Sequence, residues 1–257
     1  MKEMTMPKTE DYYKGKTIVI TGAGSGIGRA TAKVFGREGA NVVSTDIDVE
    51  AAERTANEVI QIGAEATFVR CDVTVRADVD AAVKQAVGDF GQLHFALNSA
   101  GAAMGRRPFL EIDENLWERT YALNVRGTFN GCQAIIPHML EQGGGVIVNI
   151  ASVAAWIGGA GNSVHYASSK GAVNTMSMGI GREFAARNIR CLSISPGVVD
   201  SPFHDDTPQD VLDNYAAQIP MDRMALPEEI AETVLFACSD AASYLTADTI
   251  KVSGGIR

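Results

Sequence analysis

The chain has 257 residues, of which 46% are hydrophobic and 21% are charged. This balance is typical of a soluble globular protein and excludes a disordered chain. The net charge of −9 disfavours nucleic acid as a partner, and no apolar run approaches the roughly 18–20 residues that a membrane span needs.

The cysteines and the N-terminal residues offer no candidate functional site. The four cysteines lie far apart, without a CxxC motif or a histidine at ligand spacing. We therefore expect isolated thiols in a reducing cytoplasm and no metal site. Residues 1–14 are polar and predict a loose N-terminal tail. Because no linker or break in composition follows, we expect 15–257 to form one domain.

Short apolar runs alternate with longer helical segments along the whole chain. The predicted strands are 17–21, 41–45, 66–71, 93–98, 146–150, 190–195 and 249–252. The predicted helices are 27–38, 48–62, 77–90, 113–141, 165–187 and 227–238. The strands are nearly continuous apolar runs, as expected of strands covered on both faces. The pattern predicts an α/β fold of the doubly wound Rossmann type, with a seven-stranded parallel sheet flanked by helices.

The segment 198–220 breaks this alternation. It holds Pro202, Pro208 and Pro220 and only a short helical stretch near 208–218. Insertions that follow a strand commonly become lids over a ligand. We expect a substrate lid here; the alternative is a plain surface excursion.

The glycine-rich sequence TGAGSGIG lies between the first predicted strand and the first predicted helix. At such a junction the backbone N–H groups attract a pyrophosphate, and glycine lets the phosphate approach closely. The spacing differs from GxGxxG, so this motif alone does not identify a dinucleotide site. However, small or polar residues follow six consecutive strands. Because parallel strands bind ligands at their carboxyl ends, these residues predict a cleft.

Asp46 ends the second predicted strand. A carboxylate at this place accepts hydrogen bonds from an adenosine ribose and repels a 2′-phosphate. Neither Gly24 and Ser25 nor Ile47 and Asp48 supply a cation that could hold such a phosphate. The sequence therefore favours NAD over NADP. The alternative role for Asp46 is that of an acid at the N-terminus of the next helix.

Ser152, Tyr166 and Lys170 are the candidate reactive group. Tyr166 and Lys170 are four residues apart on a predicted helix, so they share one face. A phenol with a pKa near 10 is a poor base at neutral pH, but a nearby ammonium favours the phenolate. Ser152, at a strand end, can orient a substrate oxygen. Asn124, on the inward face of helix 113–141, either holds a backbone carbonyl and a water leading to Lys170 or satisfies a core position.

Together these motifs resemble the short-chain dehydrogenase/reductase family, from TGAGSGIG through NSAG, YASSK and SPGVVDS to the terminal SGGIR. The resemblance implies that Tyr166 is the general acid/base, and that Lys170 lowers its pKa and holds the nicotinamide ribose. It implies that Ser152 positions the substrate oxygen and that Asn124 completes a water-linked proton relay. It also implies a homotetramer paired through the two long helices and the last strand. From the motifs and the resemblance, the predicted cofactor-binding residues are Gly22, Ser25, Gly26, Ile27, Gly28, Asp46, Ile47, Asp72, Val73, Asn98, Ala100, Gly101, Tyr166, Lys170, Pro196, Gly197, Val199 and Ser201.

Several positions depart from the usual pattern of that family. Asp222 and Ala247 stand where glycine is frequent, and Ser253 replaces a frequent aspartate. These three departures bear on C-terminal packing and assembly. Ser99 and Ser201 replace Asn and Thr but remain small and polar, so they threaten cofactor binding little.

The expected reaction is reversible hydride transfer between a secondary alcohol and NAD. An aromatic wall at Trp156 and a polar lid with His204, Asp205 and Asp206 would suit a polyol, a sugar or a sugar acid. One alternative is a 3-oxoacyl-thioester reductase, which usually takes NADPH; the absence of a basic residue from the glycine loop argues against it. A second alternative is a regulatory protein that senses NAD without catalysis.

Overall fold

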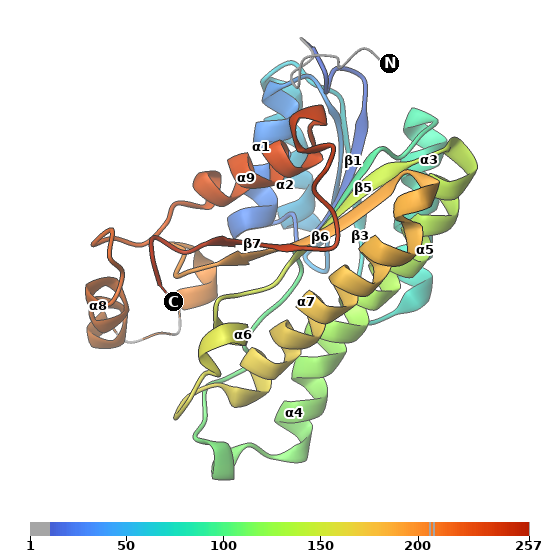
Figure 1. The fold of residues 1–257 in the computed structure, drawn as a ribbon. Coiled ribbons are helices and arrows are strands. Elements are labelled where there is room, and N and C mark those ends of the chain that lie inside the picture. The colour runs from blue at the N-terminus through green and yellow to red at the C-terminus, as the bar shows by residue number, and fades with distance from the viewer. Residues whose placement is uncertain (1–10, 206, 208, 257) are drawn as a thin grey trace.

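The computed structural model describes residues 11–205, 207 and 209–256. Seven strands form one sheet in the order β3-β2-β1-β4-β5-β6-β7. Their bounds are β1 (Thr17–Thr21), β2 (Asn41–Asp46), β3 (Ala66–Arg70), β4 (Phe95–Asn98), β5 (Gly145–Ile150), β6 (Ile189–Pro196) and β7 (Thr249–Val252). Every neighbouring pair is parallel. The predicted seven-stranded parallel sheet is therefore confirmed (Figure 1).

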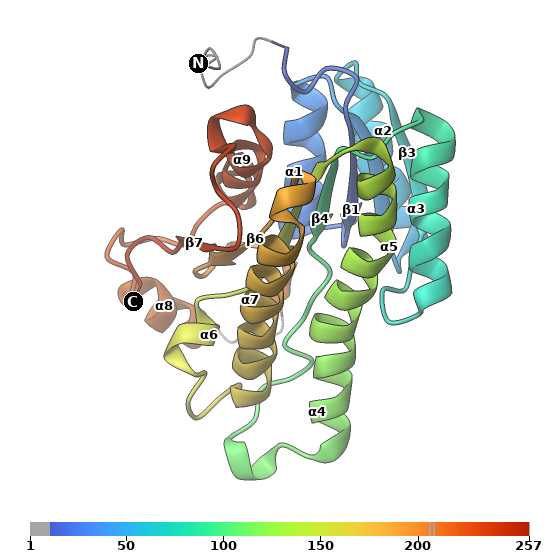
Figure 2. The ribbon, with the colours of Figure 1, turned by 45° about the vertical axis from the view of Figure 1, so that its right-hand side comes forward.

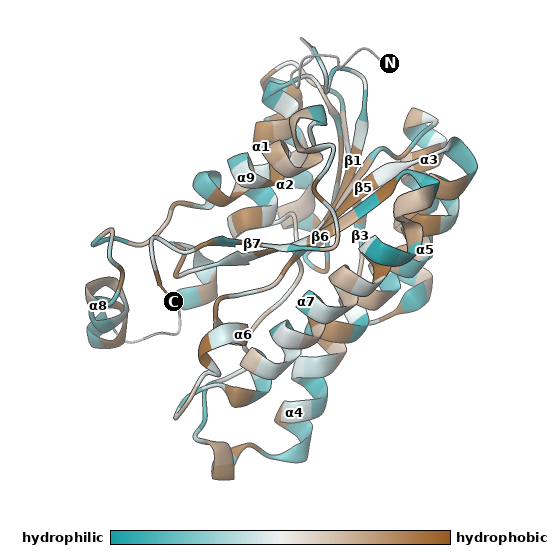
Figure 3. Ribbon diagram, in the orientation of Figure 1, coloured by the Kyte–Doolittle hydropathy of each residue, from teal (hydrophilic) through white to brown (hydrophobic). Residues whose placement is uncertain are grey.

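Helices cover both faces of this sheet (Figure 2). Their bounds are α1 (Gly26–Arg37), α2 (Val49–Gln61), α3 (Arg76–Phe90), α4 (Glu114–Tyr121), α5 (Gly127–Gln142), α6 (Ala154–Ile157), α7 (Val164–Phe184), α8 (Gln209–Ala217) and α9 (Pro227–Cys238). Helices α1, α2 and α9 pack on one face, whereas α3, α5 and α7 pack on the other. Because side chains alternate along a strand, Ile18 and Ile20 enter the first core and Val19 enters the second. Figure 3 shows the resulting hydrophobic stretches along the central strands.

The predicted helix 113–141 is not one regular helix. It consists of α4, a π-helical segment η2 (Ala122–Arg126), and α5. A π-turn holds one residue more than an α-turn and is frequent at functional sites. Hydrophobic periodicity cannot reveal it, because both flanking helices keep the α-helical period.

The loose tail predicted for 1–14 includes one residue that packs into the core. Residues 1–10 lie outside the described part of the chain, but Tyr13 is only 8% exposed. Its ring centroid lies 5.4 Å from that of Phe35 and 5.7 Å from that of Phe95. Its hydroxyl donates to the Leu235 carbonyl. Burial of this aromatic ring ties the chain to the core before β1 begins.

Two positions where the sequence lacks an expected glycine adopt the left-handed backbone. Asp222 and Ala247 both have a φ of 56°. The Cβ of an L-residue makes this conformation costly, least so for Asp and Asn. The backbone therefore keeps the shape that glycine would favour, although neither residue is glycine. In the described part of the chain, no helix has both the length and the apolar character to cross a membrane.

Candidate active site

A cleft opens at the carboxyl ends of the strands. Its volume is about 2160 Å³, whereas sites for one small ligand have about 300–1,000 Å³. The loop after β1 and the ends of β2 to β6 line it, together with segment 198–220. From that segment come η4 (Pro202–His204) and α8, which projects from the body of the fold (Figure 1). The cleft has room for a dinucleotide and a second molecule.

The glycine loop fits a pyrophosphate. Gly22 has a φ of +67°, and a Cβ there would lie 2.9 Å from the Ala100 Cα. Ser25, the N-cap of α1, makes no side-chain cap hydrogen bond, and the first turn holds no acid. The first amides of α1 are therefore not claimed by a side chain and face the cleft beside Gly26 and Ile27.

Most predicted cofactor-binding residues line this cleft, but two do not. Gly28 packs behind the loop, where a Cβ would lie 2.1 Å from the Gly22 carbonyl oxygen. Asn98 is buried, and its amide donates to Asn149 Oδ1 at 2.8 Å. Both residues lie behind the lining of the cleft and shape it from the interior, and their part in cofactor binding stays a prediction. The lining members of the predicted set are Gly22, Ser25, Gly26, Ile27, Asp46, Ile47, Asp72, Val73, Ala100, Gly101, Tyr166, Lys170, Pro196, Gly197, Val199 and Ser201.

The Asp46 carboxylate lines the end of the cleft beside the glycine loop. Its two oxygens accept hydrogen bonds from the Gly24 amide at 2.9 Å and from the Asp48 amide at 3.0 Å. Arg70, which no sequence motif singles out, is paired with Asp46 across the β2–β3 register. However, Arg70 Nη1 lies 3.1 Å from Asp78 Oδ2. The Arg70 guanidinium, opposite Asp46 in the sheet register, is therefore paired with another carboxylate.

The predicted reactive group gathers at the other end. Ser152 follows β5, and Tyr166 and Lys170 lie one turn apart on α7; all three line the cleft. Lys170 Nζ donates to the Ile150 carbonyl at 2.8 Å and lies 5.8 Å from the centroid of the Tyr166 ring. Lys170 is 3% exposed. The structure thus brings a phenol, a hydroxyl and an ammonium to one wall.

Burial dominates the electrostatics of this wall. Burial raises the pKa of Tyr166 to about 12, and the hydrogen bond with Ser152 and the charge of Arg106 partly offset it. Burial also lowers the pKa of Lys170 to about 8. Burial outweighs the other two causes at Tyr166, while the Lys170 ammonium donates to the Ile150 carbonyl. The expected effect of Lys170 on the Tyr166 pKa stays a prediction.

Asn124 lies in the π-helical segment and is fully buried. Its amide nitrogen donates to the Ala102 carbonyl at 2.8 Å and to the Thr120 carbonyl at 3.0 Å. Its Oδ1 has no partner among the described residues. A Cβ on Gly101 would lie 2.7 Å from this oxygen and 2.9 Å from Lys170 Nζ. Asn124 thus holds a backbone carbonyl, as one of the two predicted roles requires, and presents a free acceptor on the side of Lys170.

Beside the predicted His204, three lining residues that the sequence did not single out lie near Tyr166: Arg106, Phe203 and Thr207. The Arg106 guanidinium donates to Thr207 Oγ1 and lies 3.3 Å from His204 Nδ1. The Phe203 ring centroid lies 5.6 Å from that of Tyr166. The adjacent arginines at 106–107 were the only signal in the sequence, and charge alone does not show where a side chain points.

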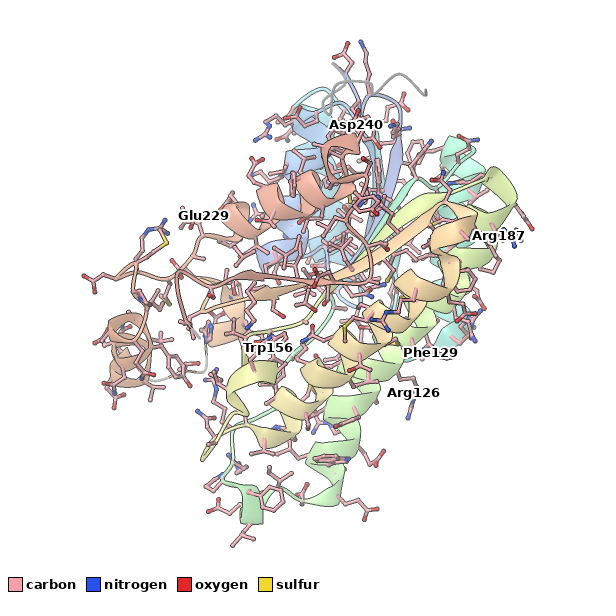
Figure 4. All side chains as sticks on the ribbon, viewed as in Figure 1. Arg126, Phe129, Trp156, Arg187, Glu229 and Asp240 are labelled. Atoms are coloured by element: carbon pink, nitrogen blue, oxygen red, sulfur yellow. The ribbon has the colours of Figure 1, made fainter. Side chains whose placement is uncertain are left out.

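The aromatic wall predicted at Trp156 is wrong. Trp156 projects from α6 (Figure 4), is 54% exposed and does not line the cleft. Lys251 Nζ lies 3.8 Å from its ring centroid, so this ring stacks against a cation instead. Of the predicted lid residues, His204 lines the cleft and Asp205 is exposed, whereas Asp206 lies outside the described residues.

Comparison with known proteins gives consistent matches over nearly the whole chain. A family model described as enoyl-(acyl carrier protein) reductase matches residues 22–257. The 2,5-dichloro-2,5-cyclohexadiene-1,4-diol dehydrogenase LinX of Sphingobium indicum is 38% identical over 241 residues, which are 94% of this chain and 96% of that protein. The 3-oxoacyl-[acyl-carrier-protein] reductase FabG of Thermotoga maritima is 33% identical over 243 residues, 95% of this chain and 98% of that protein. A solved structure of 7α-hydroxysteroid dehydrogenase with NADH and 7-oxo glycochenodeoxycholic acid superposes with a TM-score of 0.90 at 34% identity, covering 96% of each chain.

Proposed function

The chain belongs to the short-chain dehydrogenase/reductase family, whose members act on CH–OH groups with NAD(P), and from this premise we propose that it transfers a hydride between a secondary alcohol and NAD. The observation that carries this proposal is the meeting of Tyr166, Ser152 and Lys170 on one wall of a cleft that begins at a phosphate-binding loop. A regulatory protein that only bound NAD, without catalysis, would not need these three side chains on one wall of the cleft.

The proposed roles follow from the chemistry of the side chains. When bound, the nicotinamide supplies the acceptor for the hydride. Tyr166 takes the hydroxyl proton in the oxidation and returns it in the reduction. Ser152 and Tyr166 both hydrogen-bond the substrate oxygen, so that they stabilise the negative charge that develops on it during the reaction. The buried Lys170 holds the cofactor ribose and relays the proton toward Asn124.

NAD is proposed over NADP because of the charges around Asp46. A 2′-phosphate would meet this carboxylate, and no Lys or Arg lies beside it among the described residues that line the cleft. The ion pair of Arg70 with Asp78 withholds the guanidinium that stands nearest in the sheet register. The NADH in the 7α-hydroxysteroid dehydrogenase structure is consistent with this choice.

The proposed substrate is a small polyhydroxylated alcohol, a sugar or a sugar acid. The wall is Phe203 rather than Trp156, and His204, Thr207 and Arg106 supply polar groups. The name of LinX, which denotes a cyclic diol, supports a compact polyol. The similarity to FabG keeps a 3-oxoacyl-thioester reductase as the second candidate.

We further propose a cytoplasmic homotetramer that pairs α5, α7 and β7. On α5, Phe129 is 47% exposed and points outward beside Arg126 (Figure 4). An exposed aromatic ring on a long helix supports an interface. Sedimentation would test it, and a monomer at micromolar concentration would contradict it.

The test is a panel of polyols, sugars, sugar acids, steroids and oxoacyl thioesters with NAD and NADP, followed by nicotinamide absorbance. We expect turnover with NAD, and a loss of about 10²–10⁴-fold in Tyr166→Phe with cofactor binding retained. Tyr244→Phe, at an exposed tyrosine, is the matched control. Turnover of Tyr166→Phe at the wild-type rate would refute the assigned base. Exclusive use of oxoacyl thioesters with NADPH would favour the second candidate.

A further inference from the structure

Two arginines after β4 line the cleft, Arg106 and Arg107; Arg107 is exposed, whereas Arg106 is half-buried against segment 198–220. Among the described residues, the Arg106 side chain contacts Thr207 and His204, both in segment 198–220. Arg106 and Tyr166 line the same cleft, and Phe203, the neighbour of His204, has its ring centroid 5.6 Å from that of Tyr166. The guanidinium therefore stands on the same side of the cleft as the catalytic tyrosine, and its charge partly offsets the rise of the Tyr166 pKa.

Arg106 has only neutral partners among the described residues. Thr207 offers a hydroxyl, and burial and Arg106 itself lower the pKa of His204, which favours the neutral imidazole. The carboxylates that line the described cleft, Asp46 and Asp72, belong to the adenosine end. Other arginines do find carboxylates; these are Arg29, Arg37, Arg70, Arg76 and Arg223. A half-buried guanidinium has five N–H donors and is stabilised by an anion.

The backbone around Arg106 is fixed to the residues that precede Tyr166. The Arg107 amide donates to the Asn162 carbonyl at 2.7 Å. The buried His165 places Nε2 3.0 Å from the Ala103 carbonyl and 3.2 Å from the Gly105 carbonyl, so this nitrogen carries the proton and donates to both. These contacts set the distance between Arg106 and the catalytic tyrosine. A solvated surface arginine would not need such support.

We propose that Arg106 binds a carboxylate carried by the substrate, so that the preferred substrates are hydroxy acids; this rests on the proposed function. A guanidinium pairs with a carboxylate through two parallel hydrogen bonds. The single positive charge matches a carboxylate better than a doubly charged phosphate. In a chain of net charge −9, a local cation at the substrate end also draws an anion to the reacting face.

The kinetic test compares 4-hydroxycyclohexanecarboxylate with its methyl ester, which differs by one charge. In Arg106→Gln we expect kcat/KM for the acid to fall about 10- to 100-fold, as for a lost charge-assisted pair, with the ester little affected. For Arg106→Lys we expect a kcat/KM for the acid between those of the wild type and Arg106→Gln, because lysine keeps the positive charge but cannot form two parallel hydrogen bonds with a carboxylate. Arg187→Gln is the charge-matched control, since Arg187 is exposed on η3 (Ala185–Arg187), at the far end of α7 (Figure 4).

A binding test separates this proposal from the proposed function. Calorimetry measures the binding of unreactive cyclohexanecarboxylate, and of cyclohexyl phosphate, to the enzyme with NADH. We expect carboxylate binding in the wild type and in Arg187→Gln, and its loss in Arg106→Gln, whether or not an alcohol is oxidised. Equal binding to Arg106→Gln, no binding to the wild type, or tighter binding of the phosphate would overturn the proposal, even if alcohols are turned over.

Discussion

Replacing Lys170 by Met should stabilise the protein while it removes activity. Lys170 is 3% exposed, and its pKa falls from 10.5 to about 8. This shift of about 2.5 pKa units corresponds to about 3 kcal/mol of unfavourable burial of the charged form. Met keeps the unbranched chain and removes the charge. It also removes the buried, charge-assisted hydrogen bond to the Ile150 carbonyl, a loss of about 2 kcal/mol. Near pH 7 we therefore expect a net gain of about 1 kcal/mol.

The gain should depend on pH in a defined direction. Between the folded pKa of about 8 and the ordinary value of 10.5, the unfolded chain holds a proton that the folded chain has released. The stability of the wild type therefore rises with pH across this window, and the penalty is complete below it. Near pH 10 less than about 1 kcal/mol of the penalty remains, so the lost hydrogen bond should then make Lys170→Met the less stable protein by about 1 kcal/mol. Tyr166, with its raised pKa, lowers stability only above its ordinary value of 10.0, and it does so in both proteins.

Urea unfolding at matched protein concentration, from neutral to alkaline pH, would measure this difference. Lys84→Met, at an exposed lysine on α3, is the control and should show no such pH dependence. The reasoning is refuted if Lys170→Met is less stable than the wild type at neutral pH, or if its stability relative to the wild type does not fall as pH rises.

Two further predictions concern the backbone and the cofactor. Ala247→Gly should raise the free energy of unfolding by about 0.5–1 kcal/mol, because it relieves the left-handed φ at the cost of a more flexible unfolded chain. Asp222→Gly should raise it less, since Asp tolerates this conformation. An unchanged urea midpoint in Ala247→Gly would contradict the inferred backbone strain. Asp46→Asn should raise the NADP-to-NAD ratio of kcat/KM by about tenfold, because about 1–3 kcal/mol of repulsion at close range disappears. Asp48→Asn, at the exposed neighbour that caps α2, should leave the ratio nearly unchanged; an equal change in both variants would show that general charge is responsible.

Local sequence patterns predicted the sheet and most of the residues that line the cleft, because both depend on short stretches of the chain. Buried parallel strands read as apolar runs, and the spacing of Tyr166 and Lys170 follows from the helical period. The residues that sequence reasoning missed depend on contacts between distant segments. Arg106 meets Thr207 across the cleft, and Trp156 turns toward Lys251. The balance that sets the Lys170 pKa depends on burial by several elements, which no motif encodes.

The π-helical turn at Ala122–Arg126 also constrains which changes in length this chain tolerates. Each residue of an α-helix advances the side chains by about 100°, whereas the π-turn takes up one extra residue within a single turn. Losing one residue here would regularise the turn and leave the 16 residues of α5 on their present faces. A deletion inside a regular turn of α5 has no such extra residue to remove and would turn the side chains on one side of it by about 100°. Single-residue deletions should therefore disturb packing less within this turn than inside α5, and their main cost would be the displacement of Asn124.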